Sequence, residues 1–133
     1  MKFARVTFIV AGVWGVVVLT PLYFLVDVTG RPYPPPADYP QFFYGFLSVA
    51  MAWQIAFVMI GWKPVRFRPL MIPCIVEKFG HVVGVAVLYG YGRLPPADLA
   101  AAGPDLLLGA LFIASFAVTR SPVNPRSFDR PAQ

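Results

Sequence analysis

Long apolar runs, separated by short polar or proline-containing segments, are the main pattern in this sequence. An α-helix needs about 20 apolar residues to cross the ~30 Å hydrocarbon core of a bilayer, and residues 5–27 and 40–62 form two runs of that length. Two further runs, 69–91 and 96–119, are interrupted by ionisable side chains. The pattern predicts an all-α, polytopic membrane protein in which residues 1–133 form a single antiparallel bundle of four transmembrane helices.

The first run also has to be compared with a signal peptide, because Lys2 and Arg5 precede its apolar part. It stays apolar from Val6 to Val26, which is longer than the roughly 7–15 residues of a signal-peptide core. Its end carries Tyr23 and other bulky residues where a cleavage site needs small ones. We therefore expect a first helix that is retained.

Basic residues alternate between the two sides of this predicted topology. Lys and Arg are retained on the cytoplasmic side of membrane proteins. One side carries eight of the 11 basic residues and the other carries two. We therefore expect both termini in the cytoplasm and a multi-pass protein of the inner or plasma membrane. The larger group is Lys2, Arg5, Lys63, Arg66, Arg68, Arg120, Arg126 and Arg130, and the smaller is Arg31 and Arg93.

Prolines mark the connections between the runs. The segment 31–40, RPYPPPADYP, cannot continue a helix, because proline lacks the backbone donor and clashes with the preceding turn. For the same reason Pro21 is expected to bend the first helix. The tail 120–133 is short, basic and rich in proline, so we expect it to be disordered.

Composition supports a membrane protein and argues against other classes. The chain is 58% hydrophobic and only 13% charged, whereas soluble domains are about 25% charged. The net charge of +5 does not predict nucleic-acid binding, because the basic residues lie in short segments between apolar runs instead of on one hydrated surface. We expect no nucleic-acid partner.

Ionisable residues inside the third and fourth runs are the candidate functional residues. A charged side chain in hydrocarbon costs at least ~2.5–3.5 kcal/mol and is by default a functional hypothesis. Glu77 and His81 are four residues apart and share a helix face, whereas Lys78 points about 100° away. The rise along each helix places Asp105 at the depth of His81, and Gln54 of the second helix at the depth of Glu77. Lys78 lies between these levels, within reach of either carboxylate.

Two interpretations of these residues remain open. Carboxylate–histidine pairs in a low dielectric have altered pKa values, which suits proton transfer or recognition of a cationic ligand. Alternatively, Glu77, Asp105, Lys78 and a protonated His81 sum to zero charge and tie helices together, although interhelical polar bonds contribute only ~0.6–2 kcal/mol.

Two alternatives also remain for the position of individual side chains. Lys78 either joins this network or extends towards the cytoplasm, and Asp105 either follows a kink at Pro104 or lies in the first turn of a helix that begins there.

Small residues on the third helix predict close packing. Gly80 and Gly84 form a GxxxG pattern, which lets helix backbones approach each other. We expect this pattern to mediate packing within the chain. Cys74, on the same helix, is expected to pack in the interior and not to react.

Cofactor and metal chemistry have little support in this sequence. Cys74 is the only cysteine and His81 the only histidine, so a cysteine metal cluster or a bis-histidine haem would need a second chain. No nucleophile elbow, phosphate loop or dinucleotide fingerprint is present. We expect no cofactor and no metal, and a lipid-modifying enzyme is the least favoured function.

A further set of residues, from Asp27 onwards, is similar to a known family. The set consists of Asp27 at the end of the first helix, Trp53-Gln54 in the second, Arg66-x-Arg68-Pro69 before a helix containing His81, and Pro104-Asp105-Leu106-Leu107. In these residues the chain resembles the EXPERA-domain four-helix membrane proteins, the sigma-2 receptor and emopamil-binding type. The resemblance implies a lipid-accessible cavity for a sterol-like or amine ligand, lined by Asp27 and Gln54. Ala50 stands where that family has an acid one turn before the glutamine, which argues against isomerase chemistry.

The sequence thus predicts a small integral membrane protein with a buried polar site between its second, third and fourth helices. We expect the site to bind a small hydrophobic or cationic ligand, or to handle protons. The alternative is a non-catalytic accessory subunit of a larger membrane complex or a homo-oligomer. The expected partners are the lipid bilayer and a lipid, sterol-like or amine ligand. The candidate site residues are Glu77, Lys78, His81, Asp105, Gln54 and Asp27.

Overall fold

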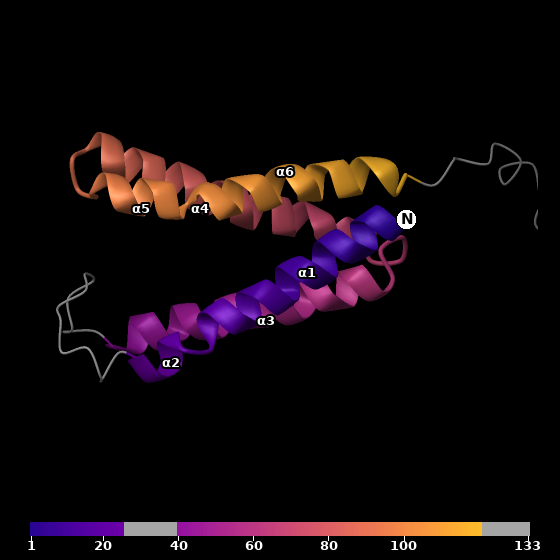
Figure 1. Cartoon of the computed structure of the whole chain (residues 1–133), viewed down its shortest axis with the longest axis horizontal. Coiled ribbons are helices and arrows are strands. Elements are labelled where there is room, and N and C mark those ends of the chain that lie inside the picture. Colours follow the sequence, from indigo (N-terminus) through magenta and orange to yellow (C-terminus); the bar gives the residue numbers. More distant parts are fainter. Residues whose placement is uncertain (26–39, 121–133) are drawn as a thin grey trace, which may run out of the picture.

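The computed structural model describes residues 1–25 and 40–120 (Figure 1). All regular structure within these two ranges is helical, which confirms the all-α prediction. The predictions made for Asp27, for most of the proline-rich segment and for the tail beyond Arg120 lie outside the described residues. The elements are α1 (Lys2–Leu19), α2 (Leu22–Leu25), α3 (Pro40–Trp62), the 3₁₀ turn η1 (Arg68–Leu70), α4 (Met71–Gly90), α5 (Pro96–Ala101) and α6 (Gly103–Val118).

Four helical segments are long and apolar enough to cross a membrane, as the sequence predicts. Large apolar side chains remain exposed along them, among them Trp14, Phe46 and Val83. Exposed apolar surface is unfavourable in water but carries no such cost in hydrocarbon, so this distribution suits a lipid environment. The four segments are Lys2–Phe24, Gln41–Trp62, Arg68–Gly90 and Pro96–Val118.

Two of these segments are interrupted at the positions where proline predicts a bend. The first is divided between α1 and α2, and Pro21 lies in the gap between them. The last is divided at Ala102, which ends α5, and Pro104 then occupies the first turn of α6. Asp105 is therefore an acid in the first turn of α6, where the free backbone donors and the helix dipole favour a negative charge.

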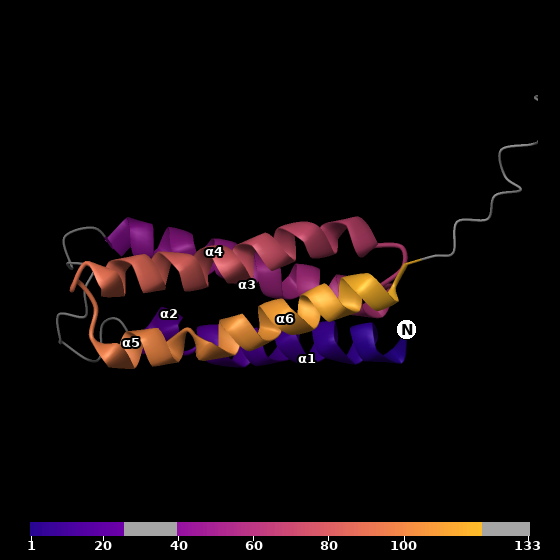
Figure 2. The ribbon, with the colours of Figure 1, turned by 90° about the horizontal axis from the view of Figure 1, so that it is seen from above.

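The helices form two closely packed pairs. Figures 1 and 2 both show α1 alongside α3, and α4 alongside α5 and α6. In Figure 1 the two pairs converge at the end where α1 begins and diverge towards the end that carries α2 and α5. The convergent end is where the interior is best packed.

Glycines allow the close contact between α1 and α3. A Cβ on Gly12 would lie 2.8 Å from the Gln54 carbonyl oxygen, and one on Gly61 would lie 2.9 Å from the Ile9 nitrogen. In both cases the added Cβ would meet a backbone atom of the other helix, so no side-chain movement could relieve the contact. Only the absence of a side chain lets these two helices approach so closely.

The prediction for the GxxxG pattern on α4 is wrong. A Cβ added to Gly80 or Gly84 would meet no atom within 4 Å among the described residues. The two glycines therefore lie on an open helix face and do not pack against any of the helices in residues 1–25 and 40–120. The contact between α4 and α6 instead uses Gly109, which faces the ring of Phe79.

Aromatic rings join three helices at the convergent end. Phe8 of α1 stacks on Phe112 of α6 with ring centroids 4.2 Å apart, and Phe57 of α3 meets Phe112 edge-on at 5.0 Å. All three rings are fully buried. Cys74 belongs to the same cluster, and its thiol donates to the Leu70 carbonyl at 2.9 Å. These contacts fix the relative position of the two helix pairs.

Arg68 fastens the start of the third segment to the end of the fourth. Its Nε donates to the Phe116 carbonyl at 3.2 Å, and its guanidinium lies 3.7 Å from the centroid of the Phe116 ring. A guanidinium stacked on a ring and bonded to a carbonyl combines a cation–π contact with a charged hydrogen bond. This arginine therefore holds η1 against α6.

Candidate functional site: a charged cluster on α4 and α6

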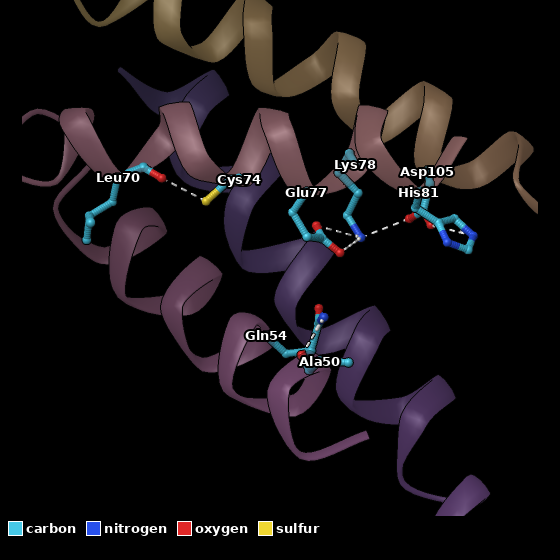
Figure 3. Close-up of polar contacts among 8 residues, drawn as sticks. All are labelled: Ala50, Gln54, Leu70, Cys74, Glu77, Lys78, His81 and Asp105. Atoms are coloured by element: carbon cyan, nitrogen blue, oxygen red, sulfur yellow. Dashed lines mark hydrogen bonds and ion pairs between the residues drawn. The ribbon is translucent and has the colours of Figure 1, made fainter. Parts of the chain in front are cut away.

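Helical geometry places the charged residues of α4 side by side in the middle of the helix. Glu77, Lys78 and His81 lie within about one turn of each other. Asp105 is brought to them by the break at Ala102, since α6 starts next to this part of α4. Figure 3 shows the four side chains together, and we call them the charged cluster (Glu77, Lys78, His81 and Asp105).

Lys78 is the centre of the charged cluster. Its Nζ lies 2.8 Å from Asp105 Oδ1 and 3.3 Å from Glu77 Oε2, so one ammonium serves two carboxylates. The residue is only 6% exposed, and the Phe57 ring lies beneath the ammonium at 5.5 Å. Of the two alternatives for Lys78, the structure therefore shows the network and not extension towards the helix end.

His81 completes the charged cluster on its open side. Its Nε2 lies 3.7 Å from Asp105 Oδ2, within ion-pair range if the ring is protonated. The depth match expected between His81 and Asp105 is thus present. The His81 side chain is 47% exposed, compared with 27% for Asp105, so the ring is the most accessible member of the cluster.

Glu77 is the least satisfied member. Its Oε1 accepts a hydrogen bond from Lys78 Nζ at 3.4 Å. Its Oε2 is buried and has no hydrogen-bond partner among the described residues, although the same ammonium is within ion-pair distance. We regard this contact as electrostatic only, because the donor geometry of a hydrogen bond is not met. A buried acceptor without a donor is costly, so this oxygen has capacity for a proton or a donor.

Gln54 lies across from the charged cluster and is not part of it. Its Nε2 donates to the Ala50 carbonyl at 3.0 Å, one turn earlier on α3, and its amide packs where a side chain on Gly15 would stand. Figure 3 shows Gln54 on the α1–α3 side, facing Glu77 and Lys78 from a separate helix pair. The expected level match of Gln54 with Glu77 therefore brings no hydrogen bond between them. Asp27, the remaining candidate, lies outside the described residues.

Phe57, which the sequence did not nominate, also shapes the charged cluster. It lies under the Lys78 ammonium, and Trp53, the neighbour of Gln54 in the sequence, packs against the buried cluster that contains Phe57. An aromatic residue three positions after Gln54, on the neighbouring helix face, is the only signal the sequence offers for this contact. Aromatic residues are too frequent in this chain for that signal to be specific.

The charges of the cluster do not balance without a further positive charge. Two carboxylates and one ammonium sum to −1 when His81 is neutral. In a low dielectric an unbalanced charge is costly, so one further positive charge at the cluster would offset that cost. Among the described residues no group of His, Cys, Asp and Glu side chains is placed to hold a metal ion.

No protein-family model matches this sequence, and comparisons with curated proteins and with solved structures find no similar protein. The resemblance to EXPERA-domain proteins therefore stays a prediction.

Proposed function

We propose that this chain is a multi-pass integral membrane protein that holds a single exchangeable positive charge at its charged cluster. In this proposal the four apolar segments form an antiparallel bundle that crosses the membrane, with both termini in the cytoplasm. The clustering of basic residues on one side of the predicted topology supports that orientation. Neither an enzyme reaction nor a resident cofactor is part of the proposal.

The observation that carries the proposal is the net charge of the cluster combined with its partial exposure. Lys78 is almost fully buried, but the side chains of Glu77 and Asp105 keep 30% and 27% of their exposure. A purely structural network would gain most by closing around its charges, because a charged side chain that faces hydrocarbon is costly. The open side, formed by His81 and Asp105, gives a proton or a small amine access to the carboxylates.

The two candidate charges share one chemistry. A proton on His81 and an alkylammonium ion both supply a single positive charge and hydrogen-bond donors to carboxylate oxygens. The Lys78 ammonium, 2.8 Å from Asp105 Oδ1, supports the proposal that these oxygens can pair with an amine. An added amine would compete with protonation of His81, since either one restores neutrality.

His81 provides a direct test, because it is the only histidine in the chain. The full-length protein with ¹⁵N-labelled histidine, in lipid nanodiscs, gives one set of imidazole signals. We expect Asp105→Asn to shift the imidazole signals, because it removes the carboxylate that lies 3.7 Å from His81 Nε2. The control Asp98→Asn removes an acid of α5 outside the cluster and should leave these signals unchanged.

The second arm of the test separates a proton from an amine. Dodecylamine added to the nanodiscs should shift the His81 imidazole signals at constant pH, whereas the neutral dodecanol should not. A response to Asp105→Asn without a response to dodecylamine would identify the proton as the charge. If neither Asp105→Asn nor dodecylamine changes the His81 signals, the proposal is wrong.

An accessory subunit of a larger membrane complex, or a homo-oligomer, is the second candidate function. It is supported by the open face around Gly80 and Gly84 on α4, where added side chains would meet nothing in the described part of the chain. Small residues on a membrane helix favour contact with another helix. Purification in a mild detergent followed by mass spectrometry tests it. Stoichiometric partners that are lost in Gly84→Leu would support it, and a monomer that is stable alone would contradict it.

A further inference from the structure

A second feature lies at the convergent end, away from the charged cluster. The start of α1 and the segment after α3 enclose a pocket of about 530 Å³. We call it the basic pocket. It is lined by Met1, Lys2 and Arg5 on one side and by residues 63–66 on the other.

The basic pocket concentrates positive charge that the described chain does not neutralise. Four of its lining residues are Lys2, Arg5, Lys63 and Arg66, and none of the lining residues is acidic. The ion pairs among the described residues all belong to the charged cluster and involve Lys78 or His81. Four basic side chains around one pocket repel each other, and an anion would relieve that repulsion.

Packing holds these side chains at the pocket. Arg5 donates to the carbonyl of Trp62 at 3.1 Å, across the contact between α1 and the end of α3. The Lys63 ammonium lies 5.7 Å from the Trp62 ring, and the Arg66 guanidinium lies 5.9 Å from the Phe67 ring. Of these contacts the Arg5 hydrogen bond joins the two sides of the pocket, whereas Lys63 and Arg66 contact their sequence neighbours and stay exposed.

The pocket lies where lipid headgroups would be found. The apolar segment Lys2–Phe24 begins beside the pocket and Gln41–Trp62 ends beside it. The segment Arg68–Gly90 begins shortly after the last residue that lines the pocket. Following Lys2 along the chain, one face of α1 carries apolar side chains at helical spacing. Each of these side chains is at least half exposed. This valine face consists of Val6, Val10, Val13 and Val17.

We propose that the basic pocket binds the phosphate of an anionic phospholipid, with an acyl chain along the valine face of α1. Lys and Arg between helix ends at the membrane surface are suited to such headgroups. The ends of Arg and Lys side chains supply several N–H donors to phosphate oxygens. The inference depends on the proposed membrane-spanning arrangement but not on the function proposed for the charged cluster.

The test compares two lipids and matched variants of the whole protein. The delipidated protein in mild detergent is titrated with phosphatidylglycerol or phosphatidylcholine of identical acyl chains, and native mass spectrometry measures the bound fraction. We expect wild type to prefer phosphatidylglycerol at least tenfold. The double variant Lys63→Gln/Arg66→Gln should bind it about 30-fold more weakly, because each basic residue near an anionic lipid contributes roughly a factor of five.

Matched controls decide between the pocket and general surface charge. Arg120→Gln removes an exposed charge that does not line the pocket and should change the affinity less than twofold. An equal loss in Arg120→Gln, or equal binding of the two lipids, would overturn the proposal. Displacement of the lipid by inorganic phosphate at similar concentration would assign the pocket to a soluble anion instead.

Two further variants keep the proposal testable if the double variant does not fold. Lys2→Gln, at an exposed first turn, should weaken binding about fivefold, and Lys63→Arg/Arg66→Lys should retain it. Unchanged binding in Lys2→Gln, or lost binding in the charge-preserving variant when it is folded, would contradict the proposal. Asp105→Asn should bind phosphatidylglycerol like wild type, so a failure of one proposal is distinguishable from a failure of the other.

Discussion

Removing the Lys78 ammonium is the most informative single perturbation of the charged cluster. Lys78→Met keeps a flexible side chain of similar length but leaves Glu77 and Asp105 without their shared partner. Because the two carboxylates then repel each other in a low dielectric, the folded state must take up a proton or lose stability. The variant therefore measures how much the ammonium contributes to the packing of α4 on α6.

The expected loss can be worked out from the geometry. Breaking a fully buried ion pair from one side costs ~3–5 kcal/mol. The side chains of Glu77 and Asp105 keep 30% and 27% exposure and so are not fully enclosed by the chain, and we therefore take a loss below that range, about 2–3 kcal/mol. The contact of the ammonium with the Phe57 ring adds ~0.5–1 kcal/mol. We expect about 3 kcal/mol in total, which corresponds to roughly 100-fold in the unfolding equilibrium constant.

Rescue separates the charge effect from a packing effect. In the triple variant Glu77→Gln/Lys78→Met/Asp105→Asn no charge remains to be paired. Replacing a complete buried ion network by neutral groups is often tolerated, so we expect at least half of the lost stability to return. A packing defect at residue 78 would not be relieved by changes at the two acids.

Unfolding by SDS in mixed micelles, followed by tryptophan fluorescence, measures these differences. The control Lys2→Met removes an exposed ammonium at the start of α1 and should change the free energy of unfolding by less than about 0.5 kcal/mol. The reasoning is refuted if Lys78→Met unfolds like wild type, or if the triple variant is no more stable than Lys78→Met.

Three further substitutions, two of them with a matched control variant, test the fold. Phe112→Ala removes a buried ring from the aromatic cluster and should cost about 3 kcal/mol, whereas Phe46→Ala, on an exposed face, should cost less than about 0.5 kcal/mol; equal losses would contradict the packing. Gly12→Ala should separate α1 from α3 at a cost of about 1–3 kcal/mol. In Gly84→Ala the added methyl group meets no atom of the described residues, so this control should be neutral or slightly stabilising. A melting temperature of Gly12→Ala below that of Gly84→Ala would agree with both expectations. Arg68→Gln should cost about 1.5–3 kcal/mol, because it loses a charged hydrogen bond and a ring contact with α6; SDS unfolding that matches wild type would show that this anchor contributes nothing.

The sequence alone determined the helical segments, because hydropathy and proline act locally. A long apolar run can satisfy its backbone in hydrocarbon only as a helix, so the spans follow from composition over about 20 residues. The breaks at Pro21 and before Pro104 follow from the missing backbone donor in the same local way. Spacing on one helix also placed Glu77 and His81 on one face, although it pointed Lys78 about 100° away.

Contacts between helices depended on the tertiary structure. Equal depth in two helices does not fix which faces turn towards each other, so Asp105 meets the charged cluster while Gln54 bonds within its own helix. A GxxxG pattern marks a smooth helix face but does not name its neighbour. The glycines that allow two helices to approach closely are therefore Gly12 and Gly61, and not Gly80 and Gly84.

The basic pocket shows the same division. The sequence assigned its basic residues to one side of the membrane, because loop charge is readable segment by segment. It could not predict that the start of α1 and the segment after α3, about 60 residues apart in the chain, enclose a common space. The pocket lies between the start of α1 and the end of α3, two helices that glycines allow to approach closely, and this approach is a property of the two helices together and of neither sequence segment alone.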